Sequence, residues 1–394
     1  MRFDKPLVGI GSLSLSCLFA MALASCGGGS SGDAPVALAT APSPAPAPAP
    51  ATPPPSAIPG DPVFASSCAN TPTRAAIGPF STQAGDCVVS YQISDAELAE
   101  FHGSFLTAPV RLKIINAVKA NFKSRIDTVL VILDQDSTQQ GTLPFGINYP
   151  VQSCSVHNPA CPRFGRLGNL WLVARDYIST GPSLHELLHG YHVDIAADTT
   201  TGYTIPTVDS SHWGFSSAGG QHGGWARDSL TPLGGGLYMA RRPKPNDGLV
   251  WGTGFSTNAN GGNSVLYSNI ELWTMGLIPD AELLSVDVAE NAVRAASDKF
   301  TASAIRTYTS VEIILRVKPE SRPSTSTPRA MRGLVVVATT AAVLPTGTLT
   351  KLNQDIEEFT QIKPSVSGTS YNFWSATGMR STLHLATASE LALP

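Results

Sequence analysis

The stretch SLHELLHGYH, residues 183–192, constrains the fold of this chain most, because it places three histidines and one glutamate within ten residues. The other 384 of the 394 residues contain only five more histidines. His185 and His189 are four residues apart, so on an α-helix with 3.6 residues per turn they share one face. Pro182 interrupts the chain just before, and Ser183 can cap a helix. We therefore expect a helix that presents both imidazoles on one side.

His185, Glu186 and His189 together form an H-E-x-x-H motif. Two imidazoles on one helical face can bind one Zn²⁺ ion in tetrahedral geometry. Bound zinc lowers the pKa of a water molecule to about 7, and a neighbouring carboxylate can transfer its proton to a leaving amine. The motif predicts a zinc site with Glu186 as the catalytic acid and base. The alternative is a surface helix whose histidines are unrelated.

A third zinc ligand has to come from outside this helix. His192 lies seven residues after His185, which is about 10 Å along the helix axis at 1.5 Å per residue, whereas a zinc–nitrogen bond is about 2 Å long. We expect His192 to lie at the rim of the site. His212, in SSHWGF, is the favoured third ligand, and Glu271, in SNIELWTMGL, is the alternative. His222 and Asp194 are further, less favoured choices.

The first 25 residues are typical of a lipoprotein signal peptide. Arg2 and Lys5 precede an apolar run that ends in the letters LASC, so Cys26 would become the acylated first residue. This predicts attachment to the bacterial envelope through a lipid anchor, at the outer membrane, facing the periplasm or the surface. An ordinary secretory signal or an uncleaved anchor is the alternative.

Residues 26–62 are rich in glycine, alanine and proline and cannot bury a core, so we expect an extended tether. Four cysteines follow it: Cys68, Cys87, Cys154 and Cys161. An even number of cysteines in an exported chain predicts disulfide bonds. We expect local pairing, Cys68 with Cys87 and Cys154 with Cys161.

The order of elements after the tether predicts the α+β class. Strands are expected at 87–94, 127–135 and 167–177, with a helix at 110–122 and the motif helix behind an edge strand at 167–177. A glycine-rich segment at 199–264 would close a metal-binding subdomain over 63–264.

A second α/β subdomain is expected over 265–394. It begins with helical spacing at 263–284, followed by strands at 309–317 and 332–340 and an amphipathic helix at 349–362. We expect the two subdomains to pack on each other near the glycine-rich segment.

The composition and the remaining motifs exclude several function classes. The net charge is −3 and no basic run is dense, so a nucleic-acid partner is not expected. No G-x-S-x-G elbow is present in residues 63–394, and the glycine-rich stretches there do not follow a strand and open a helix as a phosphate loop does. The expected partner is a protein or peptide substrate.

Three segments in order, HELLHGY, SSHWGF and YSNIELWTMGLIP, resemble a group of exported bacterial proteins regarded as zincin-like metallopeptidases. The likeness covers about residues 165–386. It implies a zincin-like N-terminal subdomain made of a mixed sheet and the active-site helix. It further implies that His185 and His189 are ligands, Glu186 is the catalytic acid and base, and His212 is the third ligand.

The resemblance also implies that Met275 lies beneath the site in a methionine-bearing turn. The sequence departs from the group's pattern at two positions: Leu188 replaces a glycine before the second motif histidine, and Trp273 replaces a tyrosine. A bulky Leu188 is expected to leave the ligands intact and to narrow the cleft.

The leading expectation is therefore a zinc metalloendopeptidase on the cell envelope. The alternative is a non-catalytic lipoprotein that binds a surface ligand, with a structural or vestigial metal site. Candidates for stabilising an oxyanion are Tyr203, His222, Tyr238 and Tyr267, and no spacing chooses among them. The substrate, the cleavage preference and the oligomeric state cannot be read from the chain.

Overall fold

The computed structural model describes the folded part of the chain with several gaps. The described residues are 76–82, 87–104, 109–139, 146–149, 156–158, 160, 162–191, 212–243, 260, 262–317, 322–323, 329–365, 370–385 and 391–393. The predicted signal peptide, Cys26 and the tether lie outside them, as do Cys68, Cys154, Cys161, His192, Asp194 and Tyr203. Cys87 is buried, and the cysteine pairing stays a prediction.

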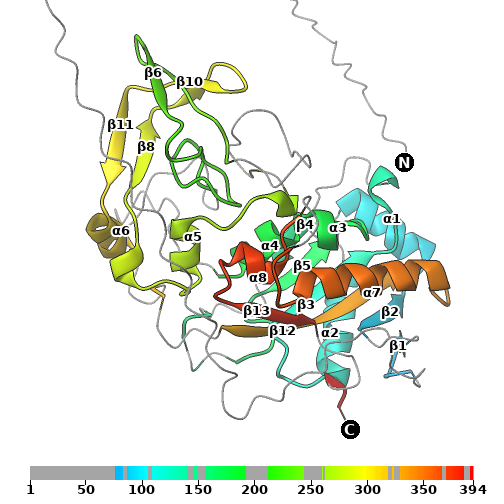
Figure 1. Cartoon of the computed structure of the whole chain (residues 1–394). Coiled ribbons are helices and arrows are strands. Elements are labelled where there is room, and N and C mark those ends of the chain that lie inside the picture. Colours follow the sequence, from blue (N-terminus) through cyan, green and yellow to red (C-terminus); the bar gives the residue numbers. More distant parts are fainter. Residues whose placement is uncertain are drawn as a thin grey trace, which may run out of the picture. The chain divides into compact units, whose positions relative to one another are not determined.

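The architecture is mixed α/β, with one large mixed sheet at its centre (Figure 1). The strand order is β1 (Phe80–Thr82), β2 (Val88–Gln92), β12 (Ala330–Thr339), β3 (Thr128–Leu133), β5 (Asn169–Leu172) and β4 (Gly146–Tyr149). β13 (Thr382–Leu385) also pairs with β12. β1 and β4 run antiparallel to their neighbours, and the interior strands are parallel.

The interior strands form because they are continuous apolar runs. β3 reads TVLVIL and every residue in it is buried, which is the pattern of a parallel strand covered on both faces. β12 is similar over its ten residues, with nine of them buried. The sequence predicted both strands, and the structure confirms them within a few residues.

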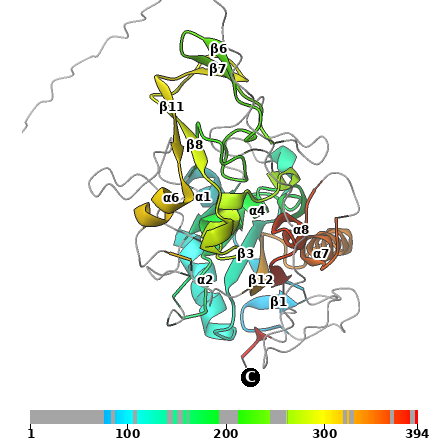
Figure 2. The same cartoon turned by 60° about the vertical axis from the view of Figure 1, so that its left-hand side comes forward.

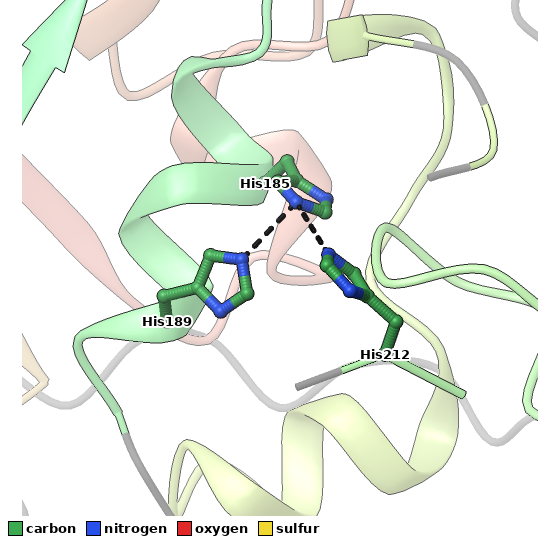
Figure 3. A group of neighbouring side chains, drawn as sticks. All are labelled: His185, His189 and His212. Carbon is green, nitrogen blue, oxygen red and sulfur yellow. Dashed lines mark hydrogen bonds between the residues drawn. The ribbon is translucent and has the colours of Figure 1, made fainter. Parts of the chain in front are cut away.

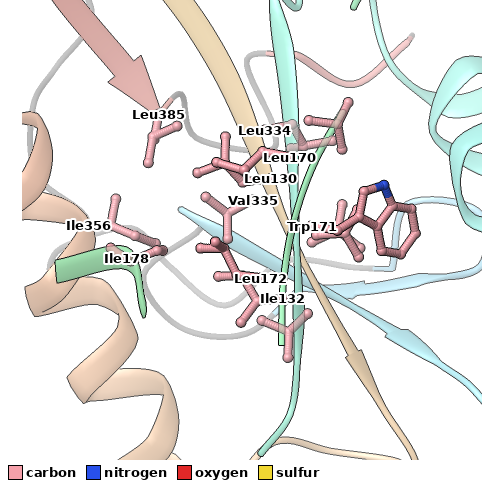
Figure 4. Packing of buried hydrophobic residues seen from close by; sticks show 14 of the residues in the cluster. Leu130, Ile132, Leu170, Trp171, Leu172, Ile178, Leu334, Val335, Ile356 and Leu385 are labelled. Atoms are coloured by element: carbon pink, nitrogen blue, oxygen red, sulfur yellow. The ribbon is translucent and has the colours of Figure 1, made fainter. Parts of the chain in front are cut away.

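Helices cover the two faces of this sheet. α1 (Asp95–Ser104) and α2 (Pro109–Asn121) cover one face, where Phe101 and the Arg111 guanidinium lie 5.6 Å and 5.0 Å from the ring of Trp171. α3 (Tyr177–Thr180) and α7 (Thr346–Thr360) pack together on the other face, and α8 (Phe373–Ala376) follows α7. Figure 4 shows Trp171 projecting to one side of the sheet and Leu130, Leu170 and Leu172 to the other.

The edge of the sheet differs from the sequence prediction. The expected edge strand at 167–177 is β5, which is interior, because β4 pairs with its outer side. β4 has only four half-buried residues, GINY, too short a run to show a period in the sequence. The helix with the H-E-x-x-H motif, α4 (Ser183–His189), contacts both β4 and β5.

A second region, called here the hairpin region, consists of residues 212–243 and 286–317. It contains a four-stranded sheet in the order β6 (Thr231–Gly234), β7 (Leu237–Met239), β10 (Lys299–Thr301) and β9 (Val293–Arg294). β8 (Val286–Glu290) and β11 (Ala304–Tyr308) form a separate antiparallel pair. Figure 2 shows these strands grouped apart from those of the main sheet.

The hairpin region has core clusters of its own. One contains Trp225 and Phe300, whose rings stack at 5.3 Å, and the other contains Trp213, Trp273 and Ile313. Trp273 in this second cluster comes from α5 (Asn269–Thr274), which also contributes Ile270. Three short elements of the described residues are 3₁₀ turns: η1 (Ser137–Gln139), η2 (Gly262–Ser264) and η3 (Asp280–Glu282). Of the helical spacing predicted for 263–284, only α5 forms an α-helix.

One predicted strand is wrong. Residues 309–317 form a helix, α6 (Ser310–Arg316), although the segment is rich in β-branched residues. Thr309 and Glu312 form a capping box: the Thr309 hydroxyl accepts from the amide of Glu312, and the Glu312 carboxylate accepts from the amide of Thr309 at 2.9 Å. This T-x-x-E signal was in the sequence, and it overrides the weak strand preference of the side chains.

The predicted boundary at residue 264 does not separate two sheets. β12 and β13 come from the C-terminal side of that position, yet β12 lies between β2 and β3 in the main sheet. Among the residues that the structure describes, no helix combines the length and the apolar character needed to cross a membrane.

Candidate metal centre

Helix α4 is anchored by its apolar face. Leu184, Leu187 and Leu188 are buried in the core of the main sheet. The expectation that Leu188 narrows a cleft is therefore wrong, because its side chain packs inward. The Tyr267 hydroxyl donates to the carbonyl of Leu184 at 2.7 Å, so this tyrosine supports the helix, and no oxyanion role is needed to explain it.

The N-terminus of α4 is held by a buried asparagine. The Asn263 Oδ1 atom accepts from the amide of Leu184 at 3.1 Å, and its Nδ2 atom donates to the carbonyl of Ile178 at 2.8 Å. Ser183, the expected cap, is instead the first helical residue, and its hydroxyl donates to the same Ile178 carbonyl. Asn263 thus fixes the start of the helix from 80 residues downstream, a contact that no local sequence signal predicts.

Three imidazoles converge on the outer side of α4 (Figure 3). The Nε2 atom of His185 lies 3.2 Å from that of His189 and 3.2 Å from that of His212. The ligand atoms of all three side chains lie within 4.8 Å of one another, and this is the group of side chains in the described part of the chain that can hold a metal ion. The structure therefore brings together the three histidines that the sequence analysis favoured.

The two distances from His185 fit a tetrahedral ion. Two nitrogen atoms bonded to one zinc at about 2.0–2.1 Å lie about 3.3 Å apart in tetrahedral geometry. The ring orientation fits as well, since the Nδ1 atom of His185 lies 2.9 Å from the carbonyl oxygen of Gln221. A carbonyl only accepts, so Nδ1 carries the proton and Nε2 presents its lone pair to the other two imidazoles.

His212 reaches the site from the hairpin region. Its neighbour Trp213 is 6% exposed and belongs to a core cluster of that region. The Trp213 amide donates to the carbonyl of His222 at 2.8 Å, and Gly214 forms a β-bridge with Gly223. Two short loops therefore hold each other, and one of them carries the third imidazole.

Glu271, the alternative third ligand, is not part of the imidazole group. It is fully buried on α5, and its carboxylate accepts four N–H bonds, from Trp213 Nε1 and from the amides of Gln221, His222 and Ser268. Burial raises the pKa of Glu271, and the four hydrogen bonds oppose that rise. All of its oxygen lone pairs point at protein donors, which leaves none for a metal.

His222 lies beside the group without joining it. Its ring packs on that of His189 at 4.1 Å between centroids, and its Nε2 atom lies 3.1 Å from the carbonyl oxygen of His185. Burial, followed by the neighbouring histidines, lowers the pKa of His222 well below its usual value, so the ring is neutral. It serves as a wall of the site.

Glu186 follows His185 on α4 and is 6% exposed. Burial raises the pKa of this carboxyl to about 8, and a hydrogen bond from the backbone of Asn148 opposes the rise. The strand β4 lies close by, since a Cβ atom added to Gly146 would be 3.0 Å from Glu186 Cγ. The side chain of Asn148, also on β4, donates to the backbone carbonyl of Glu186 at 2.7 Å.

Two further residues that the sequence analysis singled out, Tyr238 and Met275, pack in core clusters. Tyr238, on β7, stacks on Phe300 at 5.5 Å within a core cluster of the hairpin region. Met275 is fully buried in the core cluster of the main sheet, directly after α5. The residues that sequence reasoning missed are Asn148, Gln221 and Asn263, whose roles depend on long-range contacts.

No family model, curated protein or solved structure matches the chain in the comparisons with known proteins.

Proposed function

We propose that this protein is a zinc-dependent metallopeptidase with a zincin-like site. The observation that carries the proposal is the convergence of His185, His189 and His212, with the buried Glu186 on the same helix as two of them. Three nitrogen ligands with one open position are the arrangement of catalytic zinc sites, whereas structural sites have four protein ligands.

In this proposal each residue has a separate task. The three imidazoles would hold the ion, and zinc, when bound, would supply Lewis acidity that polarises a carbonyl and acidifies water. A positive ion nearby would oppose the burial that raises the pKa of Glu186, so its carboxylate would accept a proton from water and deliver it to the nitrogen of the departing amine. The hydrogen bond from His185 to the Gln221 carbonyl keeps the ligand ring in one tautomer throughout.

An extended peptide is the substrate class that the surroundings of Glu186 favour. β4 is the last strand of the main sheet, and its four residues pair with β5 on one side. A terminal strand offers backbone donors and acceptors to an added strand. Because β4 contacts α4, a peptide added there would run past the proposed catalytic carboxylate.

The test combines metal analysis with peptidase assays. Purified wild-type protein is expected to contain about one zinc per chain and to cleave casein or a peptide library. Glu186→Gln is expected to retain the zinc and to lose about 10²–10⁴-fold in kcat, the usual contribution of a positioned acid or base. Glu358→Gln, the same change at an exposed position of α7, serves as the matched control and should keep full activity.

Two outcomes would reject the proposal. A wild-type protein that binds no zinc would remove the metal site itself. Zinc binding without Glu186-dependent turnover on any peptide would favour the non-catalytic, ligand-binding lipoprotein. The envelope anchor through Cys26 is a separate proposal from the sequence, and intact-mass measurement of the mature protein tests it.

A further inference from the structure

We infer that Glu271 is a positioning residue for the metal centre, and that it acts on His185 through one peptide group, the one joining Gln221 to His222. The inference rests on the proposed zinc site. Glu271, which is not itself a ligand, would thus support a ligand through hydrogen bonds.

The bridge consists of two hydrogen bonds on opposite sides of one peptide plane. The carbonyl of Gln221 accepts from Nδ1 of His185 at 2.9 Å. The amide of the same peptide group, on His222, donates to Oε1 of Glu271 at 2.8 Å. The peptide is trans, since the cis bond found in the described part of the chain is Gly181–Pro182, and a trans peptide points its carbonyl and its N–H in opposite directions.

This arrangement extends the usual support of a metal-binding histidine. Such a histidine generally donates its second N–H to a carboxylate or a backbone carbonyl, which fixes the ring and raises its basicity. Here a carbonyl is the direct acceptor, and a carboxylate stands behind it on the same peptide. Hydrogen bonds in a chain polarise one another in a buried setting, so the negative charge of Glu271 strengthens the bond that His185 donates.

The carboxylate is held too tightly for any other role. Both oxygens accept two bonds each: Oε1 from Trp213 Nε1 and His222, and Oε2 from Gln221 and Ser268. A Cβ atom on Gly220 would lie 1.9 Å from Oε2, so the loop passes directly against the carboxylate. The bond to Trp213 also fixes the residue next to His212, so one side chain positions ligands of both regions.

The experiment compares Glu271→Gln with the wild type for zinc affinity, measured by competition with a chromophoric chelator. Glutamine has one acceptor oxygen and one NH₂ group, so its NH₂ group would face two of the four N–H donors that Glu271 now accepts from. Even where its oxygen keeps the bond from His222, the bridge loses the negative charge of the carboxylate. Loss of such an outer partner lowers metal affinity by about 10–100-fold. The absorption spectrum of the Co²⁺-loaded protein should shift in the same variant, because the geometry and basicity of a ligand change.

A matched control separates positioning from simple loop stability. Asn260 is as fully buried as Glu271 and donates to the carbonyls of Gly220 and Gly224 on the same loop, neither of which belongs to the bridging peptide. Asn260→Ala is expected to lower the free energy of unfolding while leaving the cobalt spectrum of the folded protein unchanged. Unfolding is measured for both variants.

The outcomes are distinct. Unchanged zinc affinity in Glu271→Gln would overturn the inference, as would an equal loss of affinity and an equal spectral shift in Asn260→Ala. A wild-type protein without zinc would reject the metal site and not the bridge alone.

If Glu271→Gln does not fold, NMR on the wild type gives the same decision. Zinc binding should move the amide proton of His222 downfield more than that of Gln221. The Gln221 amide donates to the same carboxylate but lies outside the bridging peptide. Equal shifts would contradict the inference.

Discussion

The main sheet region and the hairpin region use different means to hold a backbone in place. In the main sheet, β3 and β12 are buried on both faces by continuous apolar side chains. In the hairpin region the strands have two to five residues, and glycines with positive φ, Gly235 and Gly236, turn the chain between β6 and β7. Its loop at Gln221 is held by hydrogen bonds of fully buried polar side chains, that of Gln221 itself and that of Glu271 on the neighbouring α5.

The proposed metal centre lies between the main sheet region and the hairpin region. His185 and His189 come from a helix packed on the main sheet, and His212 comes from a loop packed on a core of the hairpin region. An ion bound by all three would join the regions. Packing by apolar burial tolerates small shifts, whereas a hydrogen-bonded carboxylate with four donors sets positions closely, which suits the loop that must present a ligand.

The largest expected effect comes from removing the ligand that the hairpin region supplies. His212→Ala should lower zinc affinity by more than about 100-fold, since loss of a direct ligand exceeds that of an outer partner. At zinc concentrations about 100 times the wild-type Kd, the ion should stabilise the wild type by about 2.7 kcal/mol and the variant by much less. Chemical unfolding with and without zinc measures both.

His102→Ala provides the control for that prediction, because His102 is exposed on α1, away from the site. It should retain the full zinc stabilisation. Equal stabilisation of His212→Ala and the wild type by zinc would show that the hairpin region contributes no ligand. The site would then belong to the main sheet region alone.

A pair of glycine substitutions compares the tolerance of the two regions. Gly220→Ala should lower the free energy of unfolding by about 2 kcal/mol, because the added methyl group would meet the buried carboxylate of Glu271. Gly347→Ala, near the start of α7, has open space and should stabilise by about 0.5 kcal/mol. Denaturant unfolding of both variants measures the difference, and a neutral Gly220→Ala would show that the loop is looser than its contacts indicate.

The smallest expected effect concerns His157, which contacts the backbone of Tyr191, after α4, and of Thr274, in α5. Burial lowers its pKa to about 4 from an ordinary value of 6.5. Between these values the unfolded chain binds the proton and the folded chain does not, so stability is full above about pH 6.5 and falls as the pH drops towards 4. We expect a loss of about 1–2 kcal/mol between pH 7 and pH 5 from this group.

His157→Gln removes the titrating group, so the loss of unfolding free energy between pH 7 and pH 5 should be smaller than in the wild type. His102→Gln, at an exposed position, should show the same loss as the wild type. Unfolding free energies at several pH values make the comparison. An equal loss of unfolding free energy between pH 7 and pH 5 in His157→Gln and the wild type would contradict the prediction.

The sequence predicted what depends on local pattern. The continuous apolar runs of β3 and β12, the amphipathic spacing of α7 and the four-residue spacing of His185 and His189 all had the expected outcome. His212 was favoured as the third ligand because a loop of that length can return, and the structure places it there. These inferences needed only periodicity, spacing and the reach of a side chain.

The rest depended on contacts between distant segments. β4 is too short to show a period, and its position beside α4 depends on Asn148, which donates to carbonyls 19 and 38 residues away. The burial of Glu271 in a cage of N–H donors follows from how three segments meet. Two features were missed despite a local signal: α6, with the capping box of Thr309 and Glu312, and the hairpin of β6 and β7, with glycines at its turn.

The position of β12 also determines when the main sheet can be completed during folding. Residues 333–338 pair with β3 on one side and 335–339 pair with β2 on the other, so the centre of the sheet is filled by a segment that follows its partners in β3 by 205 residues and those in β2 by 247. Pairing over such a separation is slow, since a long loop must close first. During synthesis, the place between β2 and β3 therefore stays unfilled until the last quarter of the polypeptide has been made.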